Sequence, residues 1–422
     1  MAMYSRVKNS LFPFFLFLFS FLLSTQLGRH FFFPFSYIFG IRVDYLAPTI
    51  YVTDILSILL LLVWLVQSIN RLNSLKKTIQ RRSFLFLLAI IFLVINYSFS
   101  LSKPLWIYHL FRSLQLVLLF FFFRQYGKKK NVYSTVVGGL FVGSLFELTL
   151  SLLQLSLRRS LQHIWYFFGE RRFSILTPGI AKARLFGVEF LRPYGTFSHP
   201  NSLAGFYLLL YTFVLTQKKI TNMWFKICFL FFSSALIIIS FSRAILVIFI
   251  LINLLYFFSQ KIDCRPCTIS KIVLSLFLLF LVFNTTGDPQ SLQKRIDFFG
   301  NSLHLIQQKP ITGVGIGSYL IAQQVFPERY PIFFEQPVHN IFFLLMAELG
   351  LPLTLILFYS IYRLVPRSPK DEVGYSEPFI RKSYFFLPFL CVLLTGSVDH
   401  YWVTLQQNVL LLAVIFGILF SS

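Results

Sequence analysis

Charged residues are scarce in this sequence, and acidic residues are the scarcest. Only 13% of the 422 residues are charged, whereas about a quarter are charged in an ordinary soluble domain. The 15 acidic residues face 38 Lys and Arg, and phenylalanine alone reaches 55. With 56% hydrophobic residues and a mean hydropathy of +0.72, this composition excludes a soluble enzyme, a disordered chain and a nucleic-acid binder with a basic soluble surface. It indicates a membrane protein with several spans.

Motifs for metal-dependent chemistry are missing as well. The sequence contains no HExxH, no D-x-D pair and no P-loop, so the ligands for ion-dependent nucleotide-sugar chemistry are absent. Its four cysteines include one CxxC pair, Cys264-Arg-Pro-Cys267, which offers two ligands where a structural zinc needs four. We therefore predict no metal and no cofactor.

Long apolar runs are what the sequence has in abundance. About twelve stretches are apolar enough for membrane helices: 11–27, 50–69, 83–101, 105–123, 132–156, 200–216, 224–241, 244–258, 270–285, 338–362, 383–398 and 403–421. They are apolar on every side, whereas strands of an outer-membrane barrel alternate. The seventh and eighth stretches are short and can also be read as one re-entrant hairpin. The predicted fold class is all-α, a polytopic transmembrane helical bundle.

The basic residues predict the orientation of this bundle. With the N-terminus inside, every inner segment is basic, and together these segments hold more than half of the Lys and Arg: 1–10, 70–82, 124–131, 217–226, 259–271 and 363–383. Both termini are therefore expected in the cytoplasm of a bacterial cell, with the bundle in the plasma membrane. Arg6 and Lys8 precede the first stretch, but no small-residue cleavage site follows Leu23, so we expect an uncleaved anchor.

Two long loops are predicted on the outer side, at 157–200 and 286–337. Both belong to a region of 131–422 that follows a group of N-terminal membrane helices at 1–130. The first loop carries seven basic residues against Glu170 and Glu189: Arg158, Arg159, Arg171, Arg172, Lys182, Arg184 and Arg192. These bases can face water or lipid headgroups. Alternatively they hold an anionic ligand, since the planar fork of Arg suits phosphate.

The second outer loop contains a glycine run and then a histidine. The run Gly313-Val-Gly-Ile-Gly317 lacks the flanking strand and helix of a dinucleotide-binding motif, so we interpret it as a loop with unusual backbone angles. His339 follows Pro337 at the predicted start of the tenth stretch. Position alone favours a structural hydrogen-bonding role. A helix N-terminus, however, favours neutral imidazole and attracts phosphate, which would suit a general base.

A few charged residues lie inside the apolar stretches. Arg112, Glu147 and Glu348 are costly in lipid and should face the bundle interior. We expect a structural pair between Arg112 and one of the two glutamates. Gly350 and Pro352 predict a kink in the tenth stretch.

Four dispersed motifs resemble the O-antigen ligase and polymerase family, over about residues 130–420. They are Leu191-Arg-Pro-Tyr-Gly-Thr-Phe-Ser-His-Pro-Asn-Ser-Leu-Ala204, Ser240-Phe-Ser-Arg-Ala244, the Gly313–Gly317 run with His339-Asn340, and Ala347-Glu-Leu-Gly350. The N-terminal stretches are similar to the family only in hydropathy. Ala244 stands where the family usually has glycine.

The resemblance implies a membrane-embedded, metal-independent and inverting glycosyltransferase. Its donor would be an oligosaccharide on undecaprenyl diphosphate at the outer face of the plasma membrane, and its acceptor a hydroxyl of lipid A core, another glycan or a protein. Arg192 and Arg243 match the family's diphosphate-binding arginines, and His339 matches the histidine near the acceptor. Further substrate contacts are predicted at polar residues for which plain structural hydrogen bonding is the alternative: Asn340, His199, Asn201, Arg184 and Asp399.

Two other classes remain open from the sequence. One is a glycosyltransferase that uses a polyprenyl monophosphate sugar, with Asp44 in the first outer loop as its base. The other is a lipid-linked oligosaccharide flippase or transporter, although the halves of the chain show no repeat symmetry.

Overall fold

The computed structural model describes residues 2–68, 83–259, 265–286, 291–326, 336–365 and 380–421. Every one of the predicted apolar stretches is helical, and the tenth is divided into two helices. The helices in these stretches are α1 (Ala2–Leu22), α2 (Val52–Ser68), α4 (Ser83–Ser98), α5 (Lys103–Tyr126), α6 (Lys130–Leu157), α7 (Pro200–Thr216), α8 (Met223–Ile239), α9 (Arg243–Ser259), α10 (Arg265–Asn284), α13 (Ile341–Leu349), α14 (Leu351–Leu364), α15 (Ile380–Gly396) and α17 (Gln406–Leu419). The predominantly helical fold is confirmed.

Two of the described helices, α5 and α6, are long and apolar enough by themselves to cross a membrane. Most of the other apolar helices are shorter, between 10 and 17 residues. The span count of about twelve and the cytoplasmic placement of the termini therefore stay predictions. Predicted inner segments fall largely outside the described residues at 70–82 and 363–383, and so does Cys264 of the CxxC pair.

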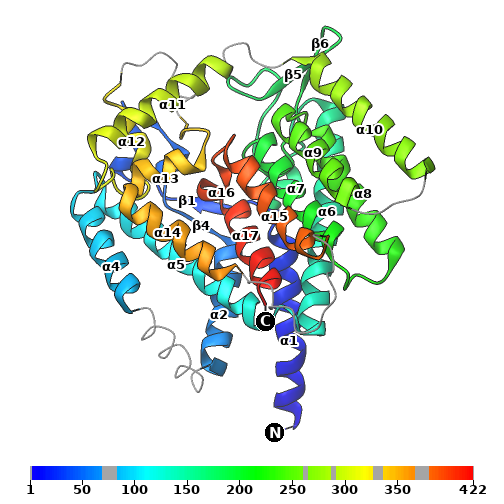
Figure 1. Cartoon of the computed structure of the whole chain (residues 1–422), viewed down its shortest axis with the longest axis horizontal. Helices are drawn as coiled ribbons and strands as arrows, with labels where there is room; N and C mark the ends of the chain where they lie inside the picture. Colours follow the sequence, from blue (N-terminus) through cyan, green and yellow to red (C-terminus); the bar gives the residue numbers. More distant parts are fainter. Residues whose placement is uncertain are drawn as a thin grey trace.

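Helix α1 packs along α6, as Figure 1 shows near the N-terminus of the chain. Gly139 and Gly143, four residues apart on α6, allow this close approach, as small residues do between membrane helices. A Cβ at Gly139 would lie 2.7 Å from the backbone oxygen of Phe17, and one at Gly143 would lie 3.0 Å from that of Phe21. The first helix is therefore an integral part of the bundle.

The tenth apolar stretch breaks at Gly350, which has φ +77° and separates α13 from α14. The glycine run packs against this break: Val314 N–H donates to the Ala347 carbonyl (2.9 Å) and Gly315 N–H donates to that of Glu348 (3.0 Å). The three glycines of 313–317 have φ between +64° and +97°. The predicted kink and the predicted unusual backbone angles are both confirmed.

A side chain from another helix holds the same break. The amide nitrogen of Asn96, on α4, donates to the carbonyls of Thr312 and Glu348, both at 2.7 Å. The indole of Trp106 in turn donates to the Asn96 side-chain oxygen (2.7 Å). The helix break, the glycine run and the α4–α5 pair are thus joined at one buried amide.

The expected pairing of Arg112 with a glutamate is wrong. Arg112 on α5 pairs with Asp54, in the first turn of α2, at 2.5 Å. Glu147 instead accepts the backbone N–H (3.0 Å) and the hydroxyl (2.7 Å) of Thr196. Glu348 accepts from the backbone at the end of the glycine run. Loop N–H groups rather than a cation therefore satisfy both glutamates. Arg112 instead forms its ion pair with Asp54, whose negative charge is favourable in the first turn of a helix.

Short helices and strands fill the segments that were predicted to lie outside. They are β1 (Gly28–His30), η1 (Pro34–Ser36), β2 (Tyr37–Ile38), β3 (Ile41–Arg42), η2 (Asp44–Leu46), β4 (Thr49–Tyr51), η4 (His163–Phe168), β5 (Lys182–Leu185), β6 (Val188–Leu191), β7 (Thr285–Thr286), α11 (Ser291–Gln308), α12 (Tyr319–Gln323) and α16 (Tyr401–Thr404). The strands pair antiparallel as β1–β4, β2–β3 and β6–β5–β7. In Figure 1 the β5–β6 hairpin lies at the end of the molecule opposite the N-terminus.

Candidate active site

Two helix starts bring the first site residues into place. His199 caps α7, and its Nδ1 accepts the backbone N–H of Asn201 at 3.1 Å. Asn340 caps α13, and its side-chain oxygen accepts the N–H groups of Phe342 and Phe343. Helix α13 thus begins at Ile341, two residues after His339, which leaves the imidazole on the segment that enters the helix.

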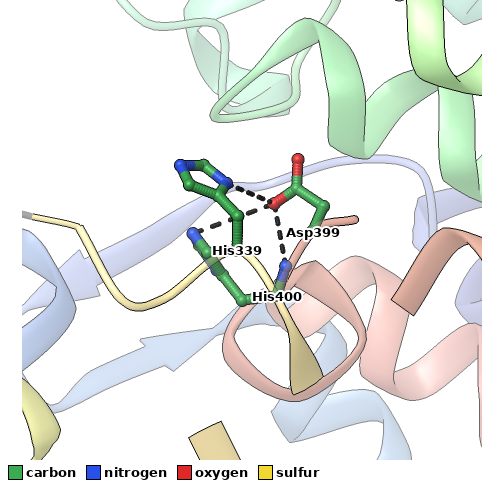
Figure 2. A group of neighbouring side chains, drawn as sticks. All are labelled: His339, Asp399 and His400. Carbon is green, nitrogen blue, oxygen red and sulfur yellow. Dashed lines mark hydrogen bonds and ion pairs between the residues drawn. The ribbon is translucent and has the colours of Figure 1, made fainter. Parts of the chain in front are cut away.

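Asp399, between α15 and α16, is the centre of the site. Its Oδ1 lies 3.3 Å from His339 Nδ1 and 3.9 Å from His400 Nε2, and Figure 2 shows both imidazoles beside this carboxylate. Its Oδ2 accepts the side-chain amide of Asn201 at 3.0 Å. A carboxylate at Nδ1 fixes the His339 tautomer that carries its proton on Nδ1 and its lone pair on Nε2. His339 is therefore arranged to accept a proton through Nε2.

A chain of hydrogen bonds connects this pair to Arg192. Arg192 Nη2 donates to the Asn201 side-chain oxygen (2.8 Å), and Arg192 Nε donates to the Ser240 carbonyl (2.8 Å). The Ser242 hydroxyl also donates to Asn201 (2.9 Å). The turn between α8 and α9 is therefore held against the residues that follow β6, and this turn ends at Arg243, the first residue of α9.

Two further arginines, Arg243 and Arg295, lie near Arg192. The charges of Arg243 and of Arg295, on α11, both act on Arg192, and Arg295 also donates to the Val398 carbonyl at 2.9 Å, next to Asp399. Like charges gathered in this way are unfavourable unless an anion joins them. The arrangement is suited to an anionic group such as a phosphate.

The protonation states around Asp399 follow from burial and charge. Burial opposes ionisation of Asp399, but its attraction to and hydrogen bond with His339, together with the charge of Arg295, hold its pKa well below the ordinary value. Burial, reinforced by Arg192, lowers the pKa of His199 to about 3, and burial lowers that of His400 to about 3. Both histidines are therefore neutral at neutral pH, and Asp399 is ionised. Burial lowers the pKa of Arg192 to about 10, which leaves it charged.

His339, Asp399 and His400 can also be read as a metal site. Their ligand atoms lie within 4.8 Å of one another, and two imidazoles with one carboxylate suit zinc or iron. The Nδ1 of His400, however, is hydrogen-bonded to the Thr404 hydroxyl (2.7 Å), so only its Nε2 faces Asp399. The geometry can therefore serve either a metal or a His–Asp base.

A cavity of about 790 Å³ opens beside this cluster. Its lining includes His339, Asp399, His199 and His400, together with residues of the ranges 26–51 and 162–180. This volume lies in the upper part of the range for small-molecule sites, about 300–1,000 Å³. The cavity can hold more than the reacting atoms alone.

The predicted site residues separate into two groups in the structure. His339, Arg192, His199, Asn201 and Asp399 form one hydrogen-bonded cluster, and Arg243 lies beside it. Asn340 serves as a helix cap and also donates to the Ser397 carbonyl at 3.1 Å. Arg184 lies in the β5–β6 hairpin, where it pairs with Glu189 at 3.7 Å, and it is not among the residues that line the cavity.

Two neighbours of the cluster, Arg295 and His400, were not predicted from the sequence. Arg295 follows Lys294 within the second predicted outer loop, so its charge in that loop was the available signal. His400 directly follows Asp399, but a histidine at a helix start carries no specific motif.

The cluster combines arginines with a His–Asp pair in a largely apolar helical protein. Such a site is suited to group transfer from an anionic donor. Residues 228–358 match the family model described as O-antigen ligase, Wzy_C, which confirms the family resemblance. Proteins of this family are bacterial inner-membrane proteins that act in glycosyl transfer for polysaccharide biosynthesis. The match contains Arg243 and His339, whereas Arg192 and Asp399 lie outside it. No curated protein matches the chain.

Proposed function

We propose that the protein transfers an oligosaccharide from undecaprenyl diphosphate to an acceptor hydroxyl at the outer face of the plasma membrane. The carrying observation is that Arg192, whose charge is felt by Arg243 and Arg295, is joined through the Asn201 side chain to the His339–Asp399 pair. A diphosphate leaving group needs several cationic donors, and an attacking hydroxyl needs a base. The cluster offers both.

His339 is the base in this proposal. Its Nε2 takes the proton of the acceptor hydroxyl as that oxygen forms a bond to the anomeric carbon of the donor. The carbon–oxygen bond to the diphosphate breaks, and its electron pair remains on the leaving oxygen. Because attack and departure occur on opposite faces, the product has inverted configuration. Asp399, 3.3 Å from Nδ1, stabilises the imidazolium that forms.

The arginines stabilise the charge that develops on undecaprenyl diphosphate without a metal ion. Arg192 is held by the Ser240 carbonyl and by Asn201, so its orientation is set before the donor binds. Arg243 is exposed at the start of α9, where the helix N-terminus adds partial positive charge. The sharp turn between α8 and α9 therefore places the exposed Arg243 near the half-buried Arg192.

The test is transfer by purified protein in nanodiscs, with an undecaprenyl-diphosphate glycan as donor. Lipid A core, a second lipid-linked glycan and a hydroxyl-bearing protein are offered in turn, because the acceptor separates a ligase from a polymerase and from a protein transferase. We expect Arg192→Ala, Arg243→Ala and His339→Ala each to abolish transfer at unchanged protein level. Arg158→Ala and His304→Ala, which change a basic residue and a histidine outside the cavity lining, serve as matched controls. Full activity of the His339 variant would exclude it as the base.

One further enzyme class has structural support. Asp44 also lines the cavity, and it pairs with Arg42 at 3.3 Å. A transferase that uses this acid as its base would lose activity in Asp44→Asn and keep it in His339→Ala. The proposed mechanism predicts the opposite result. Movement of the lipid-linked glycan across a vesicle without any transfer would instead indicate a transporter.

A further inference from the structure

The cavity lies on one side of the proposed base. Its lining includes His339 and Asp399 but, among the described residues, neither Arg192 nor Arg243. If those arginines hold the leaving diphosphate, the cavity is the space from which an attacking hydroxyl must come, because attack and departure are in line. This step rests on the proposed function, and it makes the cavity the acceptor side of the site.

Residues from the first 51 of the chain form the far side of this cavity. We name His30, Phe32, Arg42 and Tyr45 the N-terminal wall; they come from β1, β3, η2 and the segment after β1. The Arg42 guanidinium lies 4.7 Å from the Phe32 ring, and His30 stacks on the same ring at 6.0 Å. The wall thus presents flat rings and a cation.

The wall reaches the base through two ring contacts. The Tyr45 ring lies 5.6 Å from that of His400, and the His400 ring lies 5.3 Å from that of His339. The His400 ring therefore lies between Tyr45 of the wall and the proposed base, His339. The N-terminal segment, which lies outside the family match at 228–358, contributes directly to the site.

The charge of the cavity is unbalanced. Among the lining acids, Asp44 pairs with Arg42, and Asp399 is held by His339. Glu170 is buried and accepts the N–H of Leu161 and the side-chain amide of Gln154, both at 2.9 Å. The lining nevertheless contains one more arginine than acids, four against three.

Two of the four lining arginines, Arg171 and Arg172, are adjacent in the chain. Arg171 donates to the Ser198 carbonyl at 3.3 Å, and Arg172 follows it in the lining. Neither makes an ion pair within the part of the chain that the structure describes. Arg171 lines the same cavity as His30 and Tyr45 of the N-terminal wall, and its charge acts on both.

We propose that the space between the N-terminal wall and Arg171–Arg172 is an acceptor subsite that selects a glycan carrying an anionic group, a phosphate or a carboxylate. The rings of Phe32 and Tyr45 pack against the sugar faces, and the paired guanidinium groups bind the anion. The hydroxyl of the acceptor then lies toward His339.

The test measures binding without transfer, so that it does not depend on the reaction. Maltotriose, maltotriose with a terminal phosphate and a glucuronate-terminated trisaccharide are titrated into the full-length protein in nanodiscs by calorimetry. Undecaprenyl diphosphate is titrated separately. We expect the two anionic sugars to bind at least about tenfold more tightly than maltotriose, and the stronger of them identifies the preferred anion.

The double variant Arg171→Gln/Arg172→Gln should remove this preference and leave undecaprenyl diphosphate binding within about twofold. Arg42→Gln should weaken it in part, and Arg158→Gln, an exposed arginine of the same loop outside the cavity, should leave it intact. Equal binding of all three sugars, an unchanged preference in the double variant, or competition between the anionic sugars and undecaprenyl diphosphate would overturn the subsite. Selective binding in a protein that transfers nothing would retain the subsite and reject the proposed function.

Discussion

The substitution Asp399→Asn separates the proposed His–Asp base from a merely structural aspartate. The carboxylate lies 3.3 Å from His339 Nδ1, and both side chains are largely buried, at 8% and 16% exposure. With an effective dielectric constant of about 20, the attraction between unit charges at this distance is about 5 kcal/mol. It acts only once His339 has taken a proton, so it lowers the barrier to transfer. Because about 1.4 kcal/mol corresponds to a tenfold change in rate, we expect kcat to fall by about three to four powers of ten.

The assay is the initial rate of transfer with donor and acceptor varied separately. The asparagine oxygen can still accept from Asn201, so the hold on Arg192 persists and the KM for the donor should change little. Asp297→Asn, an acid of α11 outside the cavity lining, is the matched control. A variant with at least half the normal kcat would refute the role of Asp399 in proton transfer. A raised donor KM with normal kcat would show that Asp399 acts through Asn201 on Arg192 instead.

Three further predictions follow from the geometry. Treatment with EDTA should leave the transfer rate unchanged; a loss that added zinc restores would show that His339, Asp399 and His400 hold a metal. The thermal unfolding midpoint should fall as the pH is lowered from 6.5 toward 3. In this range His199 and His400 stay neutral in the folded protein but take up protons on unfolding. Each histidine therefore lowers the free energy of unfolding by up to about 1.4 kcal/mol per pH unit. His400→Gln should flatten this decline, and an equally steep decline in that variant would contradict the assignment. Gly350→Ala should destabilise the fold by about 2 kcal/mol or more, since its Cβ would lie 2.3 Å from the Ile311 carbonyl oxygen at φ +77°; an unchanged unfolding midpoint would show that the break tolerates a side chain.

Much of the helical framework could be predicted from hydropathy because each apolar run is a local signal. The break at Gly350 was also predictable, since glycine and Pro352 both disfavour a continuous helix there. The strands were not, because runs of two to four residues carry no periodicity and pair across the chain. The partner of Arg112 was missed for a similar reason: Asp54 lies 58 residues away and belongs to another helix.

The candidate site shows the same division between local and distant information. The motifs around Arg192 and His339 predicted these two residues as site residues, and the structure connects them through Asn201 and Asp399. The pairing of His339 with Asp399 spans 60 residues, so no spacing rule could predict it. In the sequence, Arg184 and Arg192 are both basic residues of one predicted outer loop. In the structure, the register of the β5–β6 hairpin pairs Arg184 with Glu189, whereas Arg192 follows the hairpin.

The buried amide of Asn96 has a consequence for how the base is positioned. Helix α13 has nine residues and is about 13 Å long. His339 and the Asn340 cap lie at one end, and Asn96 with the glycine run fixes the other. His339 thus precedes a short helix whose two ends are both held by hydrogen bonds. Little reorganisation should therefore accompany proton transfer. Asn96 belongs to α4, which lies outside the family match at 228–358, and Arg192 and Asp399 also lie outside that match. The segment 228–358 that matches the family model is therefore not a self-contained module, because residues outside the match hold its helices and complete the candidate site.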